Sequence, residues 1–168
     1  MADDMNGIVI VDKPINLSSA RVVSDVNRLF GARQVGHTGT LDPMATGILI
    51  CCLNDATRLA RFFLGVDKVY EAVLRLGVET DTQDATGTVI ATSGGVDFSR
   101  STIVSAMKRF TGVIQQRPPV YSALKHKGVP LYKLARRGKP IQKPARQVVV
   151  SEIRLGQISL PEADRKSV

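Results

Sequence analysis

The chain is organised around one polar loop, Gly36-His37-Thr38-Gly39-Thr40-Leu41-Asp42-Pro43-Met44-Ala45-Thr46-Gly47. Its glycines allow close approach of a ligand or a positive φ, and its threonine hydroxyls donate and accept hydrogen bonds. Pro43 restricts its own φ and biases Asp42 toward an extended conformation. An apolar segment, 48–53, follows directly and reads as a buried strand. Asp42 is therefore a candidate reactive carboxylate in a stiff loop; the alternative is a polar turn that merely connects two elements.

Length and composition indicate one globular domain. The chain has 168 residues, of which 43% are hydrophobic, enough to form a core rather than a disordered chain. No apolar run reaches the roughly 18 residues of a membrane span, so no membrane partner is expected. The first six residues are polar and acidic, unlike a secretory signal, which favours a cytoplasmic location.

The two cysteines, Cys51 and Cys52, are adjacent within the apolar segment. Neighbouring cysteines seldom pair, so we expect two free thiols in the core. Together with His37 and His126 they lack the spacing of a metal site, and no metal is expected.

Charge is strongly segregated along the sequence. The net charge is +8, and residues 98–151 contain no Asp or Glu but hold 12 of the 23 basic residues. The remainder carries 11 basic and 15 acidic residues, a net charge of −4. A solvated basic face would explain this, but the absence of acids favours a polyanionic partner. Nucleic acid is favoured over an anionic membrane, because no strongly amphipathic helix rich in bulky aromatics accompanies the charge.

Hydrophobic patterning predicts helices and strands in mixed order, without strict βαβ alternation. Strands are expected at 7–11, 48–53, 69–76, 88–92, 112–116 and 147–155. The strand at 69–76 alternates, so we expect it to be buried on at least one face. The resulting prediction is an α+β fold with a mixed, largely antiparallel sheet and flanking helices.

Capping signals predict four helices. One starts at Ser18 or Ser19, places Val22, Val23, Val26, Leu29 and Phe30 at helical spacing, and stops at Gly31. A short one follows Asn54 or Asp55, with Leu59, Phe62 and Phe63 inward, and stops at Gly65. Ser99 caps a third, with Ile103, Met107 and Phe110 on one face, and a short basic helix, 130–137, closes at Gly138. A polar loop at 80–87 and a rigid proline turn at 117–122 lie between these elements.

The residues alone narrow the chemistry only partly. Asp42 lacks the second carboxylate of a glycosidase, and neither a Ser or Cys nucleophile signature nor a phosphate-binding glycine loop is present. Asp42 would act alone, as nucleophile or as base. Tyr70 can stack on a base, and the basic half can hold a phosphate backbone. These features predict a nucleic-acid-binding protein with a carboxylate reaction on a base or sugar.

The loop 36–47 closely resembles the catalytic motif of the TruB-type tRNA pseudouridine synthases. Further collinear blocks resemble the same family, between residues 7 and 155: Gly7–Pro14 with Ser18-Ser19, Asp67–Tyr70, Leu76-Gly77, Thr80–Gly87, Pro118–Lys125 and Leu131–Gly138. The resemblance implies an incomplete pseudouridine synthase fold. It also implies isomerisation of the uridine at position 55 in the T-arm of tRNA, without cofactor or metal.

By this resemblance Asp42 matches the family's essential aspartate. It attacks the sugar or base, or removes a sugar proton to give a glycal; the sequence leaves both open. The target base must leave the stack before its glycosidic bond is accessible. Tyr70 matches the tyrosine that stacks on the flipped uracil, the alternative being a core strand tyrosine. His37 matches the histidine that takes the vacated position, the alternative being a locally satisfied loop histidine.

Supporting roles are also implied. Lys13 supports the loop or binds phosphate, or is a surface lysine at a strand end. Asp84 contacts the T-loop or caps a turn. Five basic residues are implied to bind RNA phosphates, the alternative being that they are solvated surface charges: Lys125, Lys127, Lys133, Arg136 and Arg137.

The resemblance assigns residues 1–168 to the N-terminal portion of a catalytic domain, with a basic RNA-binding insertion at about 117–147. By the same resemblance, we expect this chain to lack the rest of that domain, including an arginine that pairs with the aspartate, and a C-terminal PUA domain. We therefore expect weak or no activity of the isolated chain and an exposed apolar edge that favours self-association, the full-length enzyme being a monomer. Alternatives are a non-catalytic tRNA-binding or tRNA-folding module, a guide-dependent synthase, which the short N-terminus disfavours, and an interaction protein unrelated to RNA.

Overall fold

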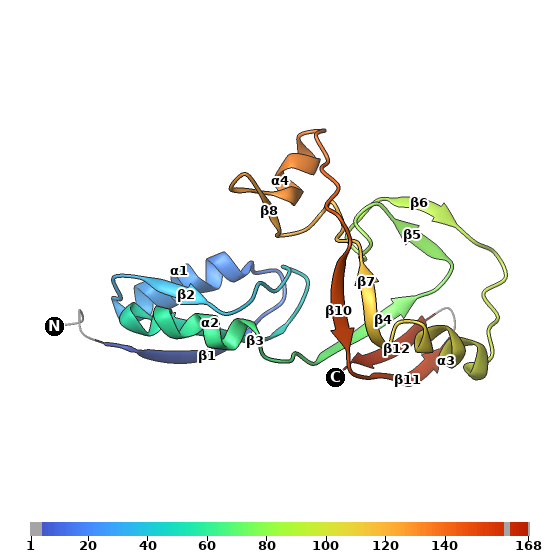
Figure 1. The fold of residues 1–168 in the computed structure, drawn as a ribbon, viewed down its shortest axis with the longest axis horizontal. Coiled ribbons are helices and arrows are strands. Elements are labelled where there is room, and N and C mark those ends of the chain that lie inside the picture. The colour runs from blue at the N-terminus through green and yellow to red at the C-terminus, as the bar shows by residue number, and fades with distance from the viewer. Residues whose placement is uncertain (1–4, 160–161, 168) are drawn as a thin grey trace. The chain divides into compact units, whose positions relative to one another are not determined.

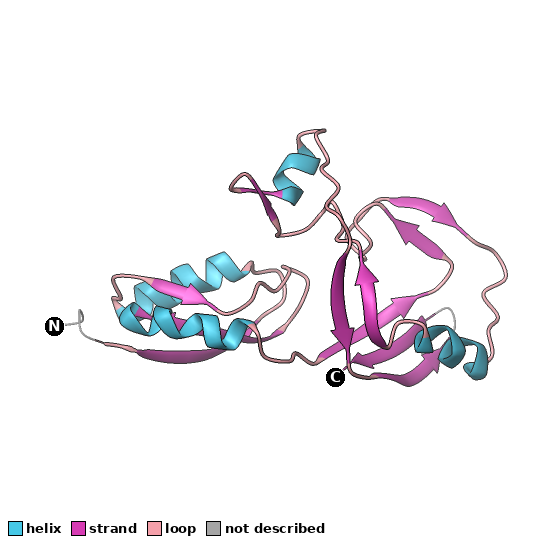
Figure 2. Ribbon diagram, in the orientation of Figure 1, coloured by secondary structure: helices cyan, strands magenta, loops and turns pink. Residues whose placement is uncertain are grey.

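The computed structural model describes residues 5–159 and 162–167, with side chains up to residue 159. The chain divides into two compact units, Met1–Val66 and Asp67–Val168, and each is described by itself (Figure 1). Every strand pair in the described residues is antiparallel, and helices accompany the strands in both units (Figure 2). This confirms the predicted α+β class. No helix in the described part of the chain has the length and apolar character needed to cross a membrane.

The first unit is a three-stranded sheet in the order β1 (Gly7–Lys13), β3 (Gly47–Leu53), β2 (Val35–His37). In the register of β1 and β3, Gly7 lies opposite Leu53 and Lys13 lies opposite Gly47. The last residue of β1 is thus brought beside the point where the polar loop enters β3.

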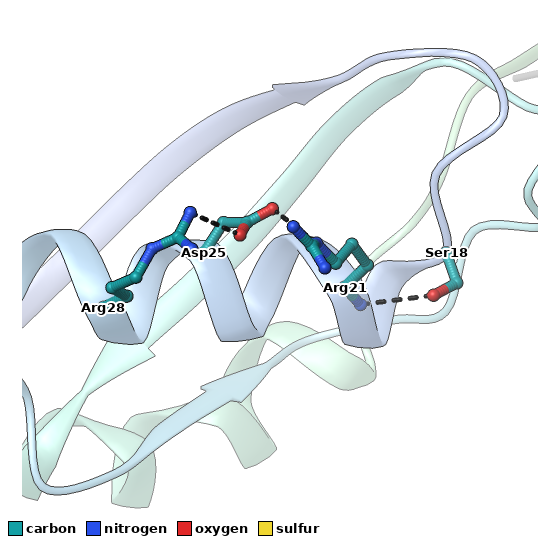
Figure 3. A network of polar contacts seen from close by, with 4 residues as sticks. All are labelled: Ser18, Arg21, Asp25 and Arg28. Atoms are coloured by element: carbon teal, nitrogen blue, oxygen red, sulfur yellow. Dashed lines mark hydrogen bonds and ion pairs between the residues drawn. The ribbon is translucent and has the colours of Figure 1, made fainter.

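Helix α1 (Ser19–Phe30) has the start and stop that the sequence predicts. The Ser18 side chain accepts a hydrogen bond from the Arg21 N–H at 3.2 Å, and Gly31 takes the left-handed conformation, φ 58°. Asp25 pairs with Arg21 and Arg28, each at 3.0 Å (Figure 3). These ion pairs are solvent-exposed, so their contribution to stability is small.

Helix α1 packs on one face of this sheet. Val22 and Val26 of the helix form a buried cluster with Leu49, Cys51 and Leu53, alternate residues of β3. The other face is largely open around Ile10 (69% exposed) and Ile48 (71% exposed). The strands predicted at 7–11 and 48–53 exist, but they are not buried on both faces. Leu29 of α1 is also exposed, although it follows the helical spacing.

The segment after β3 differs from prediction. A 3₁₀ helix, η1 (Asn54–Leu59), precedes the short α2 (Ala60–Leu64), and its N-cap residue Leu53 provides no side-chain hydrogen bond. The predicted cap at Asn54 or Asp55 is wrong. The predicted inward orientation is wrong for Leu59 and Phe62, which are both exposed, because in the described residues no element packs over them.

The second unit contains several small sheets rather than one. Its strands are β4 (Tyr70–Arg75), β5 (Val78–Thr80), β6 (Val89–Thr92), β7 (Gly112–Gln116), β8 (Lys125–His126), β9 (Val129–Pro130), β10 (Arg146–Val150), β11 (Ile153–Ser159) and β12 (Glu162–Ser167). The pairings are β11-β12-β4, β5-β6, β10-β7 and β8-β9. Two helices, α3 (Arg100–Lys108) and α4 (Leu131–Arg136), belong to the same unit.

Several predictions for this unit need correction. The single strand expected at 147–155 is interrupted at Ser151 and Glu152, because β10 and β11 belong to different sheets. Strand β12 lies in a polar tail that carried no strand signal. Strand β4 has exposed residues on both faces, including Val73 at 64%, contrary to the expected burial.

Helix α3 starts as predicted, with the Ser99 side chain accepting from the Thr102 N–H at 3.2 Å. Met107 is buried, in agreement with the predicted apolar face. Phe110, expected on that face, lies beyond the helix end and is exposed.

Candidate active-site loop and RNA-binding surface

The polar loop leaves β2 and returns into β3 within the first unit. His37 still pairs with Cys51, and the Thr38 N–H donates to the Ile50 carbonyl at 3.1 Å before the chain departs from the sheet. Gly47 begins β3 with φ +125°, a conformation that residues with a Cβ rarely adopt. The sheet thus holds both ends of the loop.

The Asp42 carboxylate is exposed, whereas the backbone around it is held. The Asp42 carbonyl accepts from the Ala45 N–H at 3.0 Å, closing a turn around Pro43. The Pro43 carbonyl accepts from the Asn16 N–H at 2.7 Å. A reactive carboxylate needs this combination of a free side chain and a fixed main chain.

Lys13 is completely buried at the end of β1. Its Nζ donates to the carbonyls of Pro14 (2.9 Å), Leu17 (2.8 Å) and Pro43 (3.4 Å). Burying an ammonium is costly unless it is hydrogen-bonded, and these carbonyls meet that requirement. The alternative of a surface lysine is therefore wrong. This geometry favours loop support over phosphate binding, since the ammonium is out of reach of solvent.

His37 is half-buried, and its Nδ1 accepts a hydrogen bond from the Gly39 N–H at 3.3 Å. In the neutral ring this bond places the proton on Nε2. The local partner agrees with the locally satisfied alternative. The role as a base-displacing residue stays a prediction.

Two residues that the sequence suggested only as helix caps make long-range contacts in this unit, Ser19 to the loop and Asn54 to the segment before β2. The Ser19 hydroxyl bonds to both backbone groups of Leu41. Asn54 is fully buried with φ 49°, and its Oδ1 accepts from the N–H groups of Arg33 (2.9 Å) and Gln34 (3.3 Å). Its Nδ2 donates to the Met5 carbonyl at 2.9 Å. No local pattern identifies these contacts, because the partners lie about 20 or more residues away.

Asp84 lies in the second unit, in the polar loop between β5 and β6. Its Oδ1 accepts from the Thr82 hydroxyl (2.8 Å), the Thr86 hydroxyl (2.6 Å) and the Thr86 N–H (2.8 Å). Gly87 follows, where a Cβ would collide with Thr82 and approach Asp81 Oδ1 at 2.5 Å. Asp84 therefore organises a tight turn, which fits the turn-capping alternative.

The electrostatics of Asp84 follow from these contacts. Partial burial by itself raises the pKa of the carboxyl, but the hydrogen bonds from Thr86, Thr82 and Gly87 together outweigh it. The pKa of Asp84 consequently lies below its ordinary value, and the ionised form is the one that the turn stabilises.

Tyr70 is the first residue of β4 and is 55% exposed. The alternative of a buried strand tyrosine is therefore wrong for this chain. An exposed ring is available for stacking, but its assignment to a flipped base stays a prediction.

The basic segment 117–147, which the resemblance predicts to be an insertion, forms a small substructure in the second unit. The β8–β9 hairpin turns through Lys127 and Gly128, both at positive φ, and α4 is anchored by buried Leu131 and Ala135. All five predicted phosphate-binding side chains are exposed. The Arg136 guanidinium lies 5.6 Å from the centre of the Tyr132 ring, within the range of a cation–π contact.

A pocket of about 210 Å³ lies at the base of this insertion. Its lining comes from the polar loop, the proline turn and Gln142: Asp81, Gln83, Arg117, Pro118, Pro119, Val120 and Gln142. The Gln142 amide donates to the Pro118 carbonyl at 2.8 Å and so ties the two ends of the insertion together.

Comparison with known proteins identifies the family. The model described as "TruB family pseudouridylate synthase (N terminal domain)" matches residues 27–167. The chain belongs to this family, as the collinear sequence blocks predicted.

Three curated relatives are each named tRNA pseudouridine synthase B. The protein of Syntrophotalea carbinolica is 46% identical over 157 residues, covering 94% of this chain and 51% of the relative. That of Francisella tularensis subsp. tularensis is 44% identical, covering 94% and 52%, and that of Yersinia pestis is 47% identical, covering 89% and 46%. The chain thus spans about half the length of the curated relatives it matches.

Two solved structures share the fold. A chain in the crystal structure of a Cbf5-Nop10-Gar1 complex is 27% identical with a TM-score of 0.67, covering 96% of this chain and 38% of that one. A chain in the structure of an H/ACA RNP bound to a substrate RNA containing 2'-deoxyuridine is 24% identical with a TM-score of 0.66, covering 96% and 37%.

Proposed function

We propose that this chain carries the catalytic aspartate of a tRNA pseudouridine synthase that isomerises the uridine at position 55 in the T-arm. The observation that carries the proposal is the loop of Asp42, whose carboxylate is exposed while the Pro43 carbonyl beside it is held. Support comes from membership of the TruB family and from relatives of about 45% identity named tRNA pseudouridine synthase B.

The reaction is an isomerisation, so atoms are conserved. The bond between ribose C1′ and uracil N1 breaks, the uracil turns, and a bond forms between C1′ and C5. The hydrogen on C5 leaves as a proton, and N1 gains a proton. Asp42 either forms a transient bond to the sugar or base, or removes a sugar proton to give a glycal. An exposed, ionisable carboxylate on a fixed backbone supports both routes.

The remaining assignments belong to substrate handling. The target uridine leaves the base stack. His37 then occupies the position that the uridine vacates, and Tyr70 stacks on the uracil. Lys13 supports the Asp42 loop through its hydrogen bond to the Pro43 carbonyl. Asp84 shapes the turn that contacts the T-loop, since its Oδ1 is already engaged within that turn.

Residues 117–147 act as the RNA-binding insertion of an N-terminal catalytic portion. This segment carries the exposed cations and contains no acidic residue. Phosphate contacts from Lys and Arg position an RNA without reading its sequence, so the insertion supplies affinity and orientation.

Tritium release tests the catalytic proposal. An unmodified tRNA transcript with tritium on uridine C5 is incubated with the chain, with Asp42→Ala and with Asp42→Asn. We expect slow release, limited to one uridine per tRNA, with the unaltered chain, because C5 loses its hydrogen only when the C1′–C5 bond forms. Both variants should release none while binding tRNA with unchanged affinity. Release that persists in Asp42→Ala would contradict the role of Asp42.

A non-catalytic tRNA-binding or tRNA-folding module is the second candidate, favoured by the chain's match to only half of its relatives' length. It predicts equal tRNA binding by the unaltered chain and Asp42→Ala, with no tritium release by either.

A further inference from the structure

The geometry points to Ser19 as a positioning residue for Asp42, an inference that rests on the proposed function. Ser19 is the first residue of α1 and is 2% exposed. Its hydroxyl points not to its own helix but to the polar loop, 22 residues further along the chain.

One hydroxyl group holds Leu41 by both of its backbone groups. The Leu41 N–H donates to Ser19 Oγ at 2.9 Å, and Ser19 Oγ donates to the Leu41 carbonyl at 2.9 Å. A serine hydroxyl can serve as acceptor and donor at once. The Leu41 carbonyl belongs to the peptide bond that joins Leu41 to Asp42, so Ser19 fixes the peptide plane directly before the carboxylate residue.

The peptide bond that joins Pro43 to Met44, one residue beyond Asp42, is held from the same part of the chain. The Pro43 carbonyl accepts from the Asn16 N–H at 2.7 Å and from Lys13 Nζ at 3.4 Å. Asp42 is therefore fixed on both sides by Ser19, at the start of α1, and by Asn16 and Lys13, which precede the helix. Since Pro43 also restricts the backbone of Asp42, the remaining freedom of this residue is in its side-chain torsions. Reactive groups act efficiently when their geometry is set before the substrate arrives.

The hydroxyl of Ser19 is not needed for the helix. The N-cap is Ser18, whose side chain accepts from the Arg21 N–H at 3.2 Å (Figure 3). Alanine is a good helix former, so Ser19→Ala removes the contact to Leu41 and leaves α1 intact. Ser18→Ala does the reverse, because it removes the cap and leaves Leu41 bonded. The two adjacent serines make a matched pair of variants.

Amide hydrogen exchange without RNA gives the first measurement. We expect the Leu41 N–H of Ser19→Ala to exchange at least roughly tenfold faster than in the unaltered chain, because it loses its buried acceptor. Ser18→Ala should leave Leu41 exchange unchanged, and Ser19→Thr, which keeps a hydroxyl, should retain most of the protection. Unchanged Leu41 exchange in Ser19→Ala would overturn the inference.

Tritium-release kinetics with tRNA give the second measurement. For Ser19→Ala we expect kcat to fall roughly 10- to 100-fold with KM unchanged, as for a small misplacement of a reactive group. Ser19→Thr should recover most of kcat, and Ser18→Ala should lower thermal stability without lowering kcat. Equal kcat in Ser19→Ala and the unaltered chain would overturn the role in catalysis. If the unaltered chain releases no tritium, the proposed function fails, while Leu41 exchange still decides whether Ser19 positions the loop.

Discussion

Lys13 is a charged residue that supports the Asp42 loop although it is buried away from solvent. Its ammonium has three backbone carbonyls as acceptors, and one of them, that of Pro43, belongs to the Asp42 loop. These bonds join the end of β1 to the connection that follows it and to the loop. A lysine beside a proline at a strand end looks like a surface residue in the sequence, and only the tertiary contacts reveal its burial.

Replacing Lys13 by methionine should lower the stability of the first unit. Met keeps a long apolar stem but leaves the carbonyls unpaired, which costs about 1–3 kcal/mol of unfolding free energy. The measurement is the urea dependence of amide NMR signals from residues 7–53. Arg33→Met, at an exposed side chain of the same unit, is the control and should change little. A Lys13→Met variant as stable as the control would show that the buried ammonium contributes nothing.

Asp84 should make the polar turn sensitive to acid. Because the pKa of this carboxyl is lowered in the folded turn, its ionised form stabilises the turn above the pH at which an unfolded aspartate titrates, about 3.9. That stabilisation is lost as the pH falls through the lower folded pKa. We expect the Thr86 amide signal to titrate below pH 3.9 in NMR spectra, and to lose this titration in Asp84→Asn. A Thr86 titration centred above pH 3.9 would contradict the assignment.

At the scale of elements, successive side chains of β3 alternate between the core under α1 and the open face of the sheet. Leu49 is 2% exposed and packs with α1, whereas its neighbour Ile48 is 71% exposed. Leu49→Ala should therefore lower the unfolding free energy by about 2–5 kcal/mol. Ile48→Ala should change it by no more than about 0.5 kcal/mol. The same urea titration by NMR compares the two variants, and equal losses would mean that the open face of the sheet is covered in solution.

Elements that carry their own local signals were predictable. Ser18 and Gly31 bound α1, and Ser99 starts α3, because caps act within one helical turn. The break at residues 151–152 was not predictable, since it depends on which strands β10 and β11 pair with. The polar strand β12 was missed for the same reason.

At the scale of the whole molecule, charge segregation predicts a salt-dependent association with tRNA. The logarithm of the tRNA association constant falls linearly with the logarithm of the salt concentration. Each phosphate that a cation no longer neutralises should make this negative slope shallower by about 0.7–0.9. Replacing the five insertion cations by glutamine should weaken binding and flatten this slope, whereas Arg33→Gln in the first unit should have little effect. Fluorescence anisotropy at several salt concentrations measures both quantities. A slope that is independent of the insertion cations would place the RNA contact elsewhere.

The open face of the first sheet predicts self-association of this chain. Ile10 of β1 lies opposite Ile50, and exposed Ile48 shares that face. Burying such a surface between copies is favourable by about 25 cal/mol per Å². We expect concentration-dependent sedimentation that Ile10→Thr with Ile48→Thr reduces. Ile15→Thr, at an exposed residue outside the strands, should leave the sedimentation unchanged. A monodisperse monomer at high concentration would contradict this prediction.

By itself, the sequence determined the α+β class, the polar loop with its single carboxylate, the helix caps, the acid-free basic segment and the family. These properties depend on neighbouring residues or on collinear sequence blocks, so they can be predicted without knowledge of the tertiary contacts. The tertiary structure decided that Lys13 is buried, that Ser19 and Asn16 hold the residues on either side of Asp42, and which strand faces stay open. Those outcomes depend on groups far apart in the sequence meeting at hydrogen-bond distance or in a packed core, which no local pattern encodes.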